Sequence, residues 1–493
     1  MLFTEPSFLF LFLPALLALY FLPWRAGAAE IRNWVLVIAS VVFYATGGGA
    51  FTFLILGSIV FNYLMAIAVD ARHGTRAGRV LLAVAVGADL AVLAALKYAD
   101  FIVSNVNVLA TPLGLHAMPL PRVLLPIGIS FFTFHAISYV VDVYRRDAVA
   151  QKSPVEAALY LLLFPQLIAG PIIRYREIAA QLGRRVVTAD HFAGGATRFV
   201  VGLAKKVLVA NVVAVVADAV FAMPLDRLTA AHAWLGVTCY TLQIYFDFSG
   251  YSDMAIGLGA MFGFRFPENF NYPYVAVSVQ DFWRRWHMSL SRWFRDYLYV
   301  PLGGNRVSPA RTYVNLVTVF FLCGLWHGAS WTFVAWGLYH GAFLVLERVF
   351  GRQRRTRVEP PEPRTQPRTT EPPNPRTPAI RHVYTIAVVM VGWVFFRADT
   401  FTQAMGMLRA MAGLAHPAQA AIDARWYLQP LTVLAIVAGI VGSGPWIARE
   451  ARRLADGRPA AGALRPIGIA VLFAASLMFI AANSYNPFIY FRF

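Results

Sequence analysis

Charged residues are scarce in this chain of 493 residues: they make up 14% of it, whereas hydrophobic residues make up 58%. This composition excludes an intrinsically disordered protein, and it is too apolar for an ordinary soluble domain, in which about a quarter of the residues are charged. Cysteine is rarer still, since Cys239 and Cys323 are the only two and each lies within an apolar stretch. A disulfide framework and a site of closely paired cysteines are therefore excluded.

Acidic residues are also few, with 25 Asp and Glu against 43 Lys and Arg, which gives a formal net charge of +18. An excess of this size can mark a nucleic-acid-binding protein, but here the basic residues fall in short runs between apolar segments. Cytoplasmic loops of membrane proteins show this distribution. We therefore interpret the excess as topological and expect membrane lipids, and no nucleic acid, as partners.

Apolar runs recur along the chain, and about 20 apolar residues suffice to cross roughly 30 Å of hydrocarbon. They predict an all-α polytopic membrane protein with about 11 or 12 transmembrane helices, forming one integral-membrane domain over residues 1–493. The N-terminus lacks the basic region of a signal peptide, so we expect the first run to be retained as a span. The simple spans are expected near residues 6–24, 33–48, 50–69, 79–97, 124–143, 193–222, 232–262, 383–396, 429–447 and 464–482.

The basic loops predict the orientation of these spans. Residues 70–79 and 25–32 are both basic, and the two agree only if both lie in the cytoplasm, which places the N-terminus and the C-terminus outside. Residues 351–381 are rich in Pro, Arg and Thr and poor in apolar side chains. We predict that they form a disordered cytoplasmic linker.

Two apolar stretches cannot be simple spans. Residues 157–173 have basic residues on both flanks and contain two prolines and a glycine. We expect a re-entrant segment here, which a membrane tolerates only where the broken backbone is buried in protein or lines a cavity. Residues 312–347 are too long for one span, so we expect a helical hairpin whose apex lies near residues 328–330.

Several polar residues interrupt the apolar runs. Asp247 and Asp253 lie among small and hydroxylated residues, which suit hydrogen bonding between helices. We expect these aspartates to order the fold and to take no part in a reaction. Lys205 and Lys206 either reach an interface along their apolar stems or face a cavity.

Two histidines are candidate functional residues. His327 lies in the sequence LWHGASW at the expected hairpin apex, and His287 lies about forty positions earlier in an arginine-rich and aromatic segment. Ionisable residues inside a membrane are costly and usually functional. A histidine suits the general base of acyl transfer, because its unperturbed pKa of about 6.5 is close to neutrality. A core histidine bonded to a neighbour is the alternative for each.

Metal binding is not predicted at either histidine, because neither has a His, Cys or carboxylate three or four residues away that reads as a ligand motif. Haem ligation by histidines on different helices remains an alternative, with His135 and His340 as further candidates. The arginines around His287 suggest another role, because arginine binds phosphate groups in a bidentate manner. The candidate donor-binding residues are Arg284, Arg285, Arg292 and Arg295, although a basic cytoplasmic flank would look the same.

The segments FWRRWHMSLSRWFRDYLYVPLGG and LWHGASW resemble the signature of the membrane-bound O-acyltransferase family, and in particular its alginate O-acetyltransferase branch. The resemblance implies helices and re-entrant segments around a central channel, with His327 as the general base and His287 as its accessory. It covers nearly the whole chain. Further matching segments are LLPIGISFFTFHAISYVVDVYR (124–145), FPQLIAGPIIRY (164–175), YFDFSGYSDMAIGLG (245–259), FPENFNYPY (266–274), GWVFFRADT (392–400) and NPFIYFRF (486–493).

The same resemblance implies an activity in the bacterial inner membrane. Acetyl groups would pass from acetyl-CoA or another acyl thioester in the cytoplasm to an exported, alginate-like polysaccharide of the cell envelope, with no permanently bound cofactor. An extracytoplasmic hydrolase-like acetyltransferase would be the partner, and Tyr490 would relay the acyl group, unless that tyrosine only anchors the chain at the interface. A transporter of a polysaccharide or lipid precursor is the alternative function, since deep histidines and re-entrant segments also suit a permeation path.

Overall fold

A computed structural model describes residues 1–22, 28–352, 379–415, 422–447, 449–450, 453, 459–482 and 485. All regular elements in these ranges are helices, and seven helical segments are long and apolar enough to cross a membrane. This confirms an all-α, multi-pass membrane protein. The seven are Ala29–Gly48, Phe51–Ala71, Arg76–Lys97, Ala189–Phe221, Trp331–Phe350, Ala379–Arg397 and Arg465–Ala482.

Other predicted spans are shorter or more polar than expected. Three apolar helices of 10–17 residues occur at Phe8–Phe21, Ile129–Tyr144 and Pro430–Gly442. These three and the seven make ten, so the expected total of about 11 or 12 spans is reached only if long helices outside both groups, such as Ala230–Met261 and Pro309–His327, are counted as well. Residues 351–352 and 379–381 end and begin helices, so the predicted linker is shorter at both ends, and its remainder lies outside the described residues.

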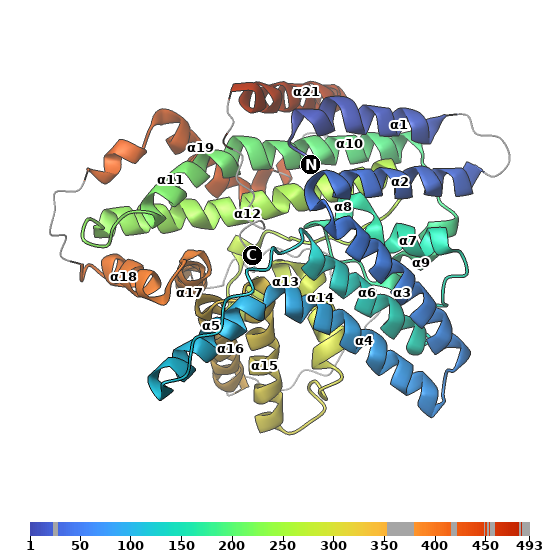
Figure 1. Ribbon diagram of the computed structural model, residues 1–493. Helices are drawn as coiled ribbons and strands as arrows, with labels where there is room; N and C mark the ends of the chain where they lie inside the picture. The colour runs from blue at the N-terminus through green and yellow to red at the C-terminus, as the bar shows by residue number, and fades with distance from the viewer. Residues whose placement is uncertain are drawn as a thin grey trace. The chain divides into compact units, whose positions relative to one another are not determined.

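The chain divides into two compact units and passes between them four times. Figure 1 labels most of the helices of both units. Unit 1 comprises residues 1–207, 248–268 and 468–493, and unit 2 comprises residues 208–247 and 269–467. The organisation as one integral-membrane domain remains a prediction. Three helices extend across the boundaries: η3 (Lys205–Ala210), α12 (Ala230–Met261) and α21 (Pro459–Ala482).

Unit 1 contains the N-terminal helices. Within it α3, α4 and α6 pack against one another, and α2 packs against α7 and α9. Its helices are η1 (Phe8–Phe12), α1 (Leu13–Phe21), α2 (Ala28–Gly48), α3 (Phe51–Ala71), α4 (Arg76–Lys97), α5 (Ala99–Ala110), η2 (Thr111–Leu113), α6 (Ile129–Tyr144), α7 (Pro154–Leu162), α8 (Phe164–Leu167), α9 (Tyr175–Gly183) and α10 (Ala189–Ala204).

Helix α6 begins later than the span expected at residues 124–143. Gly128 has a φ of +75° and precedes the helix directly. A Cβ atom on Gly128 would lie 2.7 Å from the carbonyl oxygen of Leu167, so only glycine fits this turn against the neighbouring segment. The chain therefore turns here before α6 starts.

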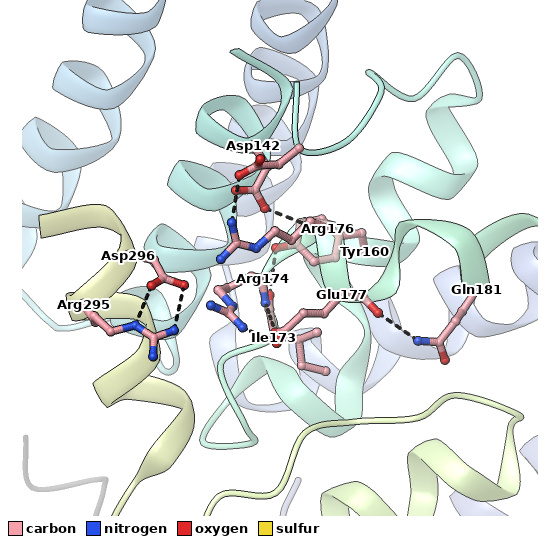
Figure 2. Close-up of polar contacts among 10 residues, drawn as sticks. Asp142, Tyr160, Ile173, Arg174, Arg176, Glu177, Gln181, Arg295 and Asp296 are labelled. Carbon is pink, nitrogen blue, oxygen red and sulfur yellow. Dashed lines mark hydrogen bonds and ion pairs between the residues drawn. The ribbon is translucent and has the colours of Figure 1, made fainter. Parts of the chain in front are cut away.

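The apolar run 157–173 is broken, as the sequence predicts, into the end of α7, the single turn of α8 and an irregular segment. Nearly all of it is buried. The Tyr160 hydroxyl donates to the carbonyl oxygen of Ile173 at 2.9 Å (Figure 2). The Ile173 amide donates to His135 Nε2 at 3.2 Å. These bonds satisfy backbone groups that a continuous helix would have paired internally.

Helices α10 and α12 meet through glycine. A Cβ atom on Gly202 would lie 2.6 Å from the carbonyl oxygen of Gly250, so the two backbones are in direct contact. Beside this contact the Asp253 carboxylate accepts from Lys205 Nζ at 2.6 Å and from Arg198 at 2.8 Å. Asp253 thus links α12 to the end of α10, which supports the predicted structural role of this aspartate, and Lys205 faces a carboxylate.

Unit 2 contains the helical hairpin that the sequence predicts. Helix α15 (Pro309–His327) packs against α16 (Trp331–Arg352), and residues 328–330 form the turn. Helix α16 also packs against α13, α17 and α18. The other helices of unit 2 are α11 (Asn211–Phe221), η4 (Pro273–Val275), α13 (Val279–Arg285), α14 (Met288–Phe294), η5 (Arg295–Tyr299), α17 (Ala379–Arg397), α18 (Phe401–Met411), η6 (Ala424–Tyr427) and α19 (Pro430–Gly442).

The hairpin depends on close approach of its two backbones, and Gly337→Ala tests this. The new Cβ atom would lie 2.3 Å from the carbonyl oxygen of Phe320, so the helices must move apart. Overpacking of this kind costs about 1–3 kcal/mol. We expect a lower midpoint of thermal unfolding for the variant purified in detergent.

Gly341→Ala is the matched control, because it lies one turn further along α16 and its Cβ atom would meet nothing closer than 3.4 Å. The control should unfold at the temperature of the unsubstituted protein. If the two variants have the same midpoint of thermal unfolding, the close approach at Gly337 does not limit stability.

Candidate active site

His327 is the last residue of α15 and is only 4% exposed. The residue after it, Gly328, is extended, and a Cβ atom there would lie 2.1 Å from a ring carbon of Phe333. Glycine is therefore required directly after the histidine, because Phe333 from the first turn of α16 packs against that backbone. The sequence His-Gly at the hairpin turn fixes the end of α15 and with it the position of the imidazole.

Aromatic rings surround the imidazole of His327. Its ring centroid lies 4.9 Å from that of Trp326, 5.1 Å from that of Trp336 and 5.0 Å from that of Phe396. The planes of Trp336 and Phe396 are inclined to the imidazole by 86° and 71°, an edge-to-face arrangement that aromatic rings favour. Rings from α15, α16 and α17 thus set the orientation of His327 and keep water from it.

His287 lies between α13 and α14 and is 1% exposed. Its φ of 42° and ψ of 54° place it in the left-handed region, which is costly for a residue with a side chain. Backbone strain of this kind persists only where surrounding contacts impose it, and it is concentrated at functional sites. The observed strain therefore supports a functional role for this position.

The contacts that impose this conformation come from the segment FPENFNYPY. The Met288 amide donates to the carbonyl oxygen of Asn269 at 2.9 Å, and the Asn271 amide donates to that of Arg285 at 2.9 Å. The Ser289 hydroxyl donates to Asn269 Oδ1 at 2.9 Å. Residues 269–271 thus bind the chain on both sides of His287. The motif is visible in the sequence, but the residues alone indicate no role for it.

Both histidines lie near one indole ring. The centroid of Trp326 is 6.2 Å from that of His287 and 4.9 Å from that of His327. Both histidines belong to unit 2, so this arrangement is internal to one compact unit. The structure therefore brings together two candidate residues that are far apart in the sequence.

Burial lowers the pKa of His287 to about 3, because the charged imidazolium is poorly solvated in this surrounding. His287 is therefore neutral at physiological pH. A group with so low a pKa is a poor general base near neutrality, but its neutral ring can still donate one hydrogen bond and accept another. This matches an accessory role better than that of the base.

A third histidine supports the aromatic cluster. His340, on α16, is fully buried, and its ring lies 5.0 Å from that of Trp283 and 5.3 Å from that of Trp336. A Cβ atom on Gly392 would lie 2.4 Å from His340 Nε2. The motif GWVFFR thus begins with glycine because α17 must pass directly over this imidazole. Access to that nitrogen is blocked, which argues against His340 as an iron ligand.

Among the four candidate arginines, Arg285 and Arg295 pair with carboxylates. Arg285 Nε donates to Asp281 at 2.9 Å, and Arg295 Nε donates to Asp296 at 2.7 Å (Figure 2). An anionic donor would compete with these carboxylates. Arg284 is exposed on α13, and Arg292 is half-buried on α14.

Two remaining predictions concern a metal and the relay tyrosine. Over the part of the chain that the structure describes, no group of three or more His, Cys, Asp or Glu side chains could hold a metal ion. Tyr490 lies outside the described residues, so its predicted role as an acyl relay is not tested by the structure.

The low pKa of His287 predicts a pH dependence of stability. As the pH falls from 7 towards 5, the unfolded chain binds a proton at this histidine (pKa about 6.5), whereas the folded protein does not. The free energy of unfolding therefore falls over this range. His287→Asn removes the titrating group, so its midpoint of thermal unfolding should fall less between pH 7 and pH 5 than that of the unsubstituted protein.

The other buried histidines are present in both proteins and cancel in this comparison. Parallel pH profiles for the two proteins would show that His287 gains or loses no proton on unfolding in this range.

The chain is similar to known proteins along its full length. Residues 120–407 match the model of the membrane-bound O-acyltransferase family. The chain is 42% identical to the probable alginate O-acetylase AlgI of Pseudomonas aeruginosa, with the full length of both chains covered. It is 36% identical to the peptidoglycan O-acetyltransferase of Helicobacter pylori over 84% of this chain and 80% of the relative. It is 30% identical to the teichoic acid D-alanyltransferase of Bacillus subtilis over 45% of this chain and 59% of the relative.

Proposed function

Because the chain belongs to the membrane-bound O-acyltransferase family, we propose that it passes acetyl groups from a cytoplasmic acyl thioester towards an exported cell-envelope polysaccharide. The names of two relatives refer to O-acetylation of alginate and of peptidoglycan. They support an acetyl group as the group transferred and a polysaccharide as the acceptor. The observation that carries the proposal is the pair of buried histidines beside Trp326. The family match, and not the histidine pair by itself, favours an acyltransferase over a transporter.

In the proposed reaction His327 is the general base. A hydroxyl oxygen attacks the carbonyl carbon of the thioester, and His327 accepts the hydroxyl proton as the carbon–oxygen bond forms. The tetrahedral intermediate then collapses, the carbon–sulfur bond breaks, and the departing thiolate takes the proton from His327. The rings of Trp326, Trp336 and Phe396 keep water from this region, so that the donor is not hydrolysed.

His287 is the proposed accessory, because its neutral ring can hydrogen-bond to the donor without adding charge. The proposed donor is acetyl-CoA or another acyl thioester, and the phosphate groups of such a donor suit arginine. Arg284, Arg285, Arg292 and Arg295 are the proposed residues that bind them, and Arg285 and Arg295 would do so in exchange for their carboxylate partners. No bound cofactor is needed for this chemistry.

The proposed site of action is the bacterial inner membrane, with both ends of the chain on the outer side and the segment 351–381 in the cytoplasm. The basic loops at residues 25–32 and 70–79 support this orientation. Fusions of a reporter to each end, with activity only outside the cytoplasm, would be the expected result.

The division of labour between the histidines can be tested with purified protein and acetyl-CoA. His327→Ala should lower kcat by about 10²-fold or more, the size of a lost general base, while donor binding is retained. His287→Ala should give a smaller fall in kcat. Turnover is followed by release of the coenzyme A thiol in the presence of an alginate oligosaccharide, and donor binding by calorimetry.

His73→Ala is the control for these variants, since His73 is exposed in the α3–α4 connection and should be replaceable without effect. Full activity of His327→Ala would refute its role as the base. A larger loss in His287→Ala than in His327→Ala would exchange the two roles.

We also propose that Tyr490 relays the acetyl group to an extracytoplasmic hydrolase-like acetyltransferase. A phenol, with a pKa of about 10, loses its proton far more easily than an aliphatic alcohol, so a histidine can assist its attack on a thioester. The phenol oxygen would form an aryl ester and release the thiol. A serine of the partner would then take the acetyl group and return the proton to the phenol oxygen.

Tyr490→Phe separates the relay from membrane anchoring, because it keeps the ring and removes only the hydroxyl. The relay predicts loss of polymer acetylation in cells, with donor binding by the purified variant unchanged. Polymer acetylated at the rate of the unsubstituted protein would show that the tyrosine serves only as an anchor.

A further inference from the structure

We propose that Asn269 is a further residue of the active site, and that its side-chain Nδ2 donates a hydrogen bond to the thioester carbonyl oxygen as negative charge develops there. This inference rests on the proposed acyl transfer. It assigns a function to the segment FPENFNYPY beyond holding the backbone of His287.

The position of Asn269 is fixed from both its main chain and its side chain. Its carbonyl oxygen accepts from the Met288 amide at 2.9 Å, which places it beside the residue that follows His287. Its Oδ1 accepts from the Ser289 hydroxyl at 2.9 Å and from the Ser289 amide at 3.3 Å. These five atoms form a clamp between residue 269 and the first turn of α14.

The clamp determines which way the amide group faces. The backbone amide of Ser289 can only donate, so Oδ1 must be the atom that faces it, and Nδ2 must face away. Asn269 is 1% exposed, and its Nδ2 has no hydrogen-bond partner among the residues that the structure describes. A buried donor without an acceptor is destabilising, and in native proteins such groups usually have a functional reason.

The reaction supplies the acceptor that this donor lacks. When the hydroxyl oxygen bonds to the thioester carbon, the carbonyl electrons move to oxygen, which becomes an anion until the carbon–sulfur bond breaks. A rigid neutral donor in a dry site stabilises that anion more than it stabilises the uncharged carbonyl. The amide of Asn269 meets this description, because its orientation is imposed by Ser289 and it carries no charge that would hold the thiolate after it leaves.

Substitutions at residues 269 and 289 distinguish a hydrogen-bond donor from a structural clamp. Asn269→Ala removes both the clamp oxygen and Nδ2, whereas Ser289→Ala weakens the clamp and leaves Nδ2 in place. We expect Asn269→Ala to lower kcat by about 10²-fold to 10³-fold with KM for acetyl-CoA changed less than about threefold. Ser289→Ala should lower kcat less than about tenfold. Equal losses of kcat in the two variants would show that Asn269 only holds Ser289 in place, and would overturn the proposal.

Asn269→Asp provides a test that does not depend on the stability of the alanine variant. A carboxylate keeps the acceptor for Ser289, but when ionised it has no proton to donate. The ratio of kcat for the variant to kcat for the unsubstituted protein should therefore fall as the pH rises and recover when the carboxyl group is protonated. A ratio close to one at every pH would also overturn the proposal.

The two hypotheses fail in different ways. If the unsubstituted protein releases no coenzyme A thiol from acetyl-CoA in the presence of an alginate oligosaccharide, both the proposed function and the role of Asn269 are refuted. If the unsubstituted protein turns over and Asn269→Ala keeps its kcat, only the role of Asn269 is refuted.

Discussion

Packing around the indole of Trp336 holds the candidate site together. This side chain is fully buried, and its ring lies 5.1 Å from that of His327, 5.3 Å from that of His340 and 5.0 Å from that of Phe396. It is also stacked on Trp393 at 6.2 Å. Helices α15, α16 and α17 therefore share one aromatic contact. A large rigid ring fixes its neighbours at little cost in side-chain entropy, which suits a site where a base must keep one orientation.

The second histidine is held by different means. His287 contacts the same cluster through Trp326, but its backbone conformation is imposed by hydrogen bonds from residues 269–271. Hydrophobic packing alone does not select a left-handed residue, because it is not directional. Hydrogen bonds on both sides of the residue do select it. The site thus combines packing, which excludes water, with directional bonds, which set the backbone.

Much of this architecture is predictable from the sequence. The hairpin at residues 312–347 follows from an apolar run too long for one span, and the break in residues 157–173 follows from its prolines, its glycine and its basic flanks. The turn before α6 was not predicted, because the need for glycine at residue 128 arises from contact with Leu167. Pairing of Arg285 and Arg295 with carboxylates was missed as well, although Asp281 and Asp296 lie nearby in the chain.

The role of Asn269 could not be predicted for a similar reason. Its sequence neighbourhood suggests only a turn rich in Asn and Pro, and the contact with Ser289 joins residues that are 20 positions apart. An asparagine amide looks the same in a sequence whether its nitrogen is paired or not. Only the hydrogen bonds from Ser289 to Oδ1 show that Nδ2 has no hydrogen-bond partner among the described residues.

The three-residue turn of the hairpin also bears on how the site assembles. Contacts between residues close in sequence form at a small entropic cost of loop closure, and chains rich in them fold quickly. The α15–α16 pair and the bonds between residues 269 and 289 are of this kind. The ion pair between Arg397 and Asp218, also within unit 2, instead joins residues 179 positions apart. The histidine-bearing framework can therefore form during synthesis before this long-range ion pair closes. The ion pair then stabilises an arrangement that is already in place.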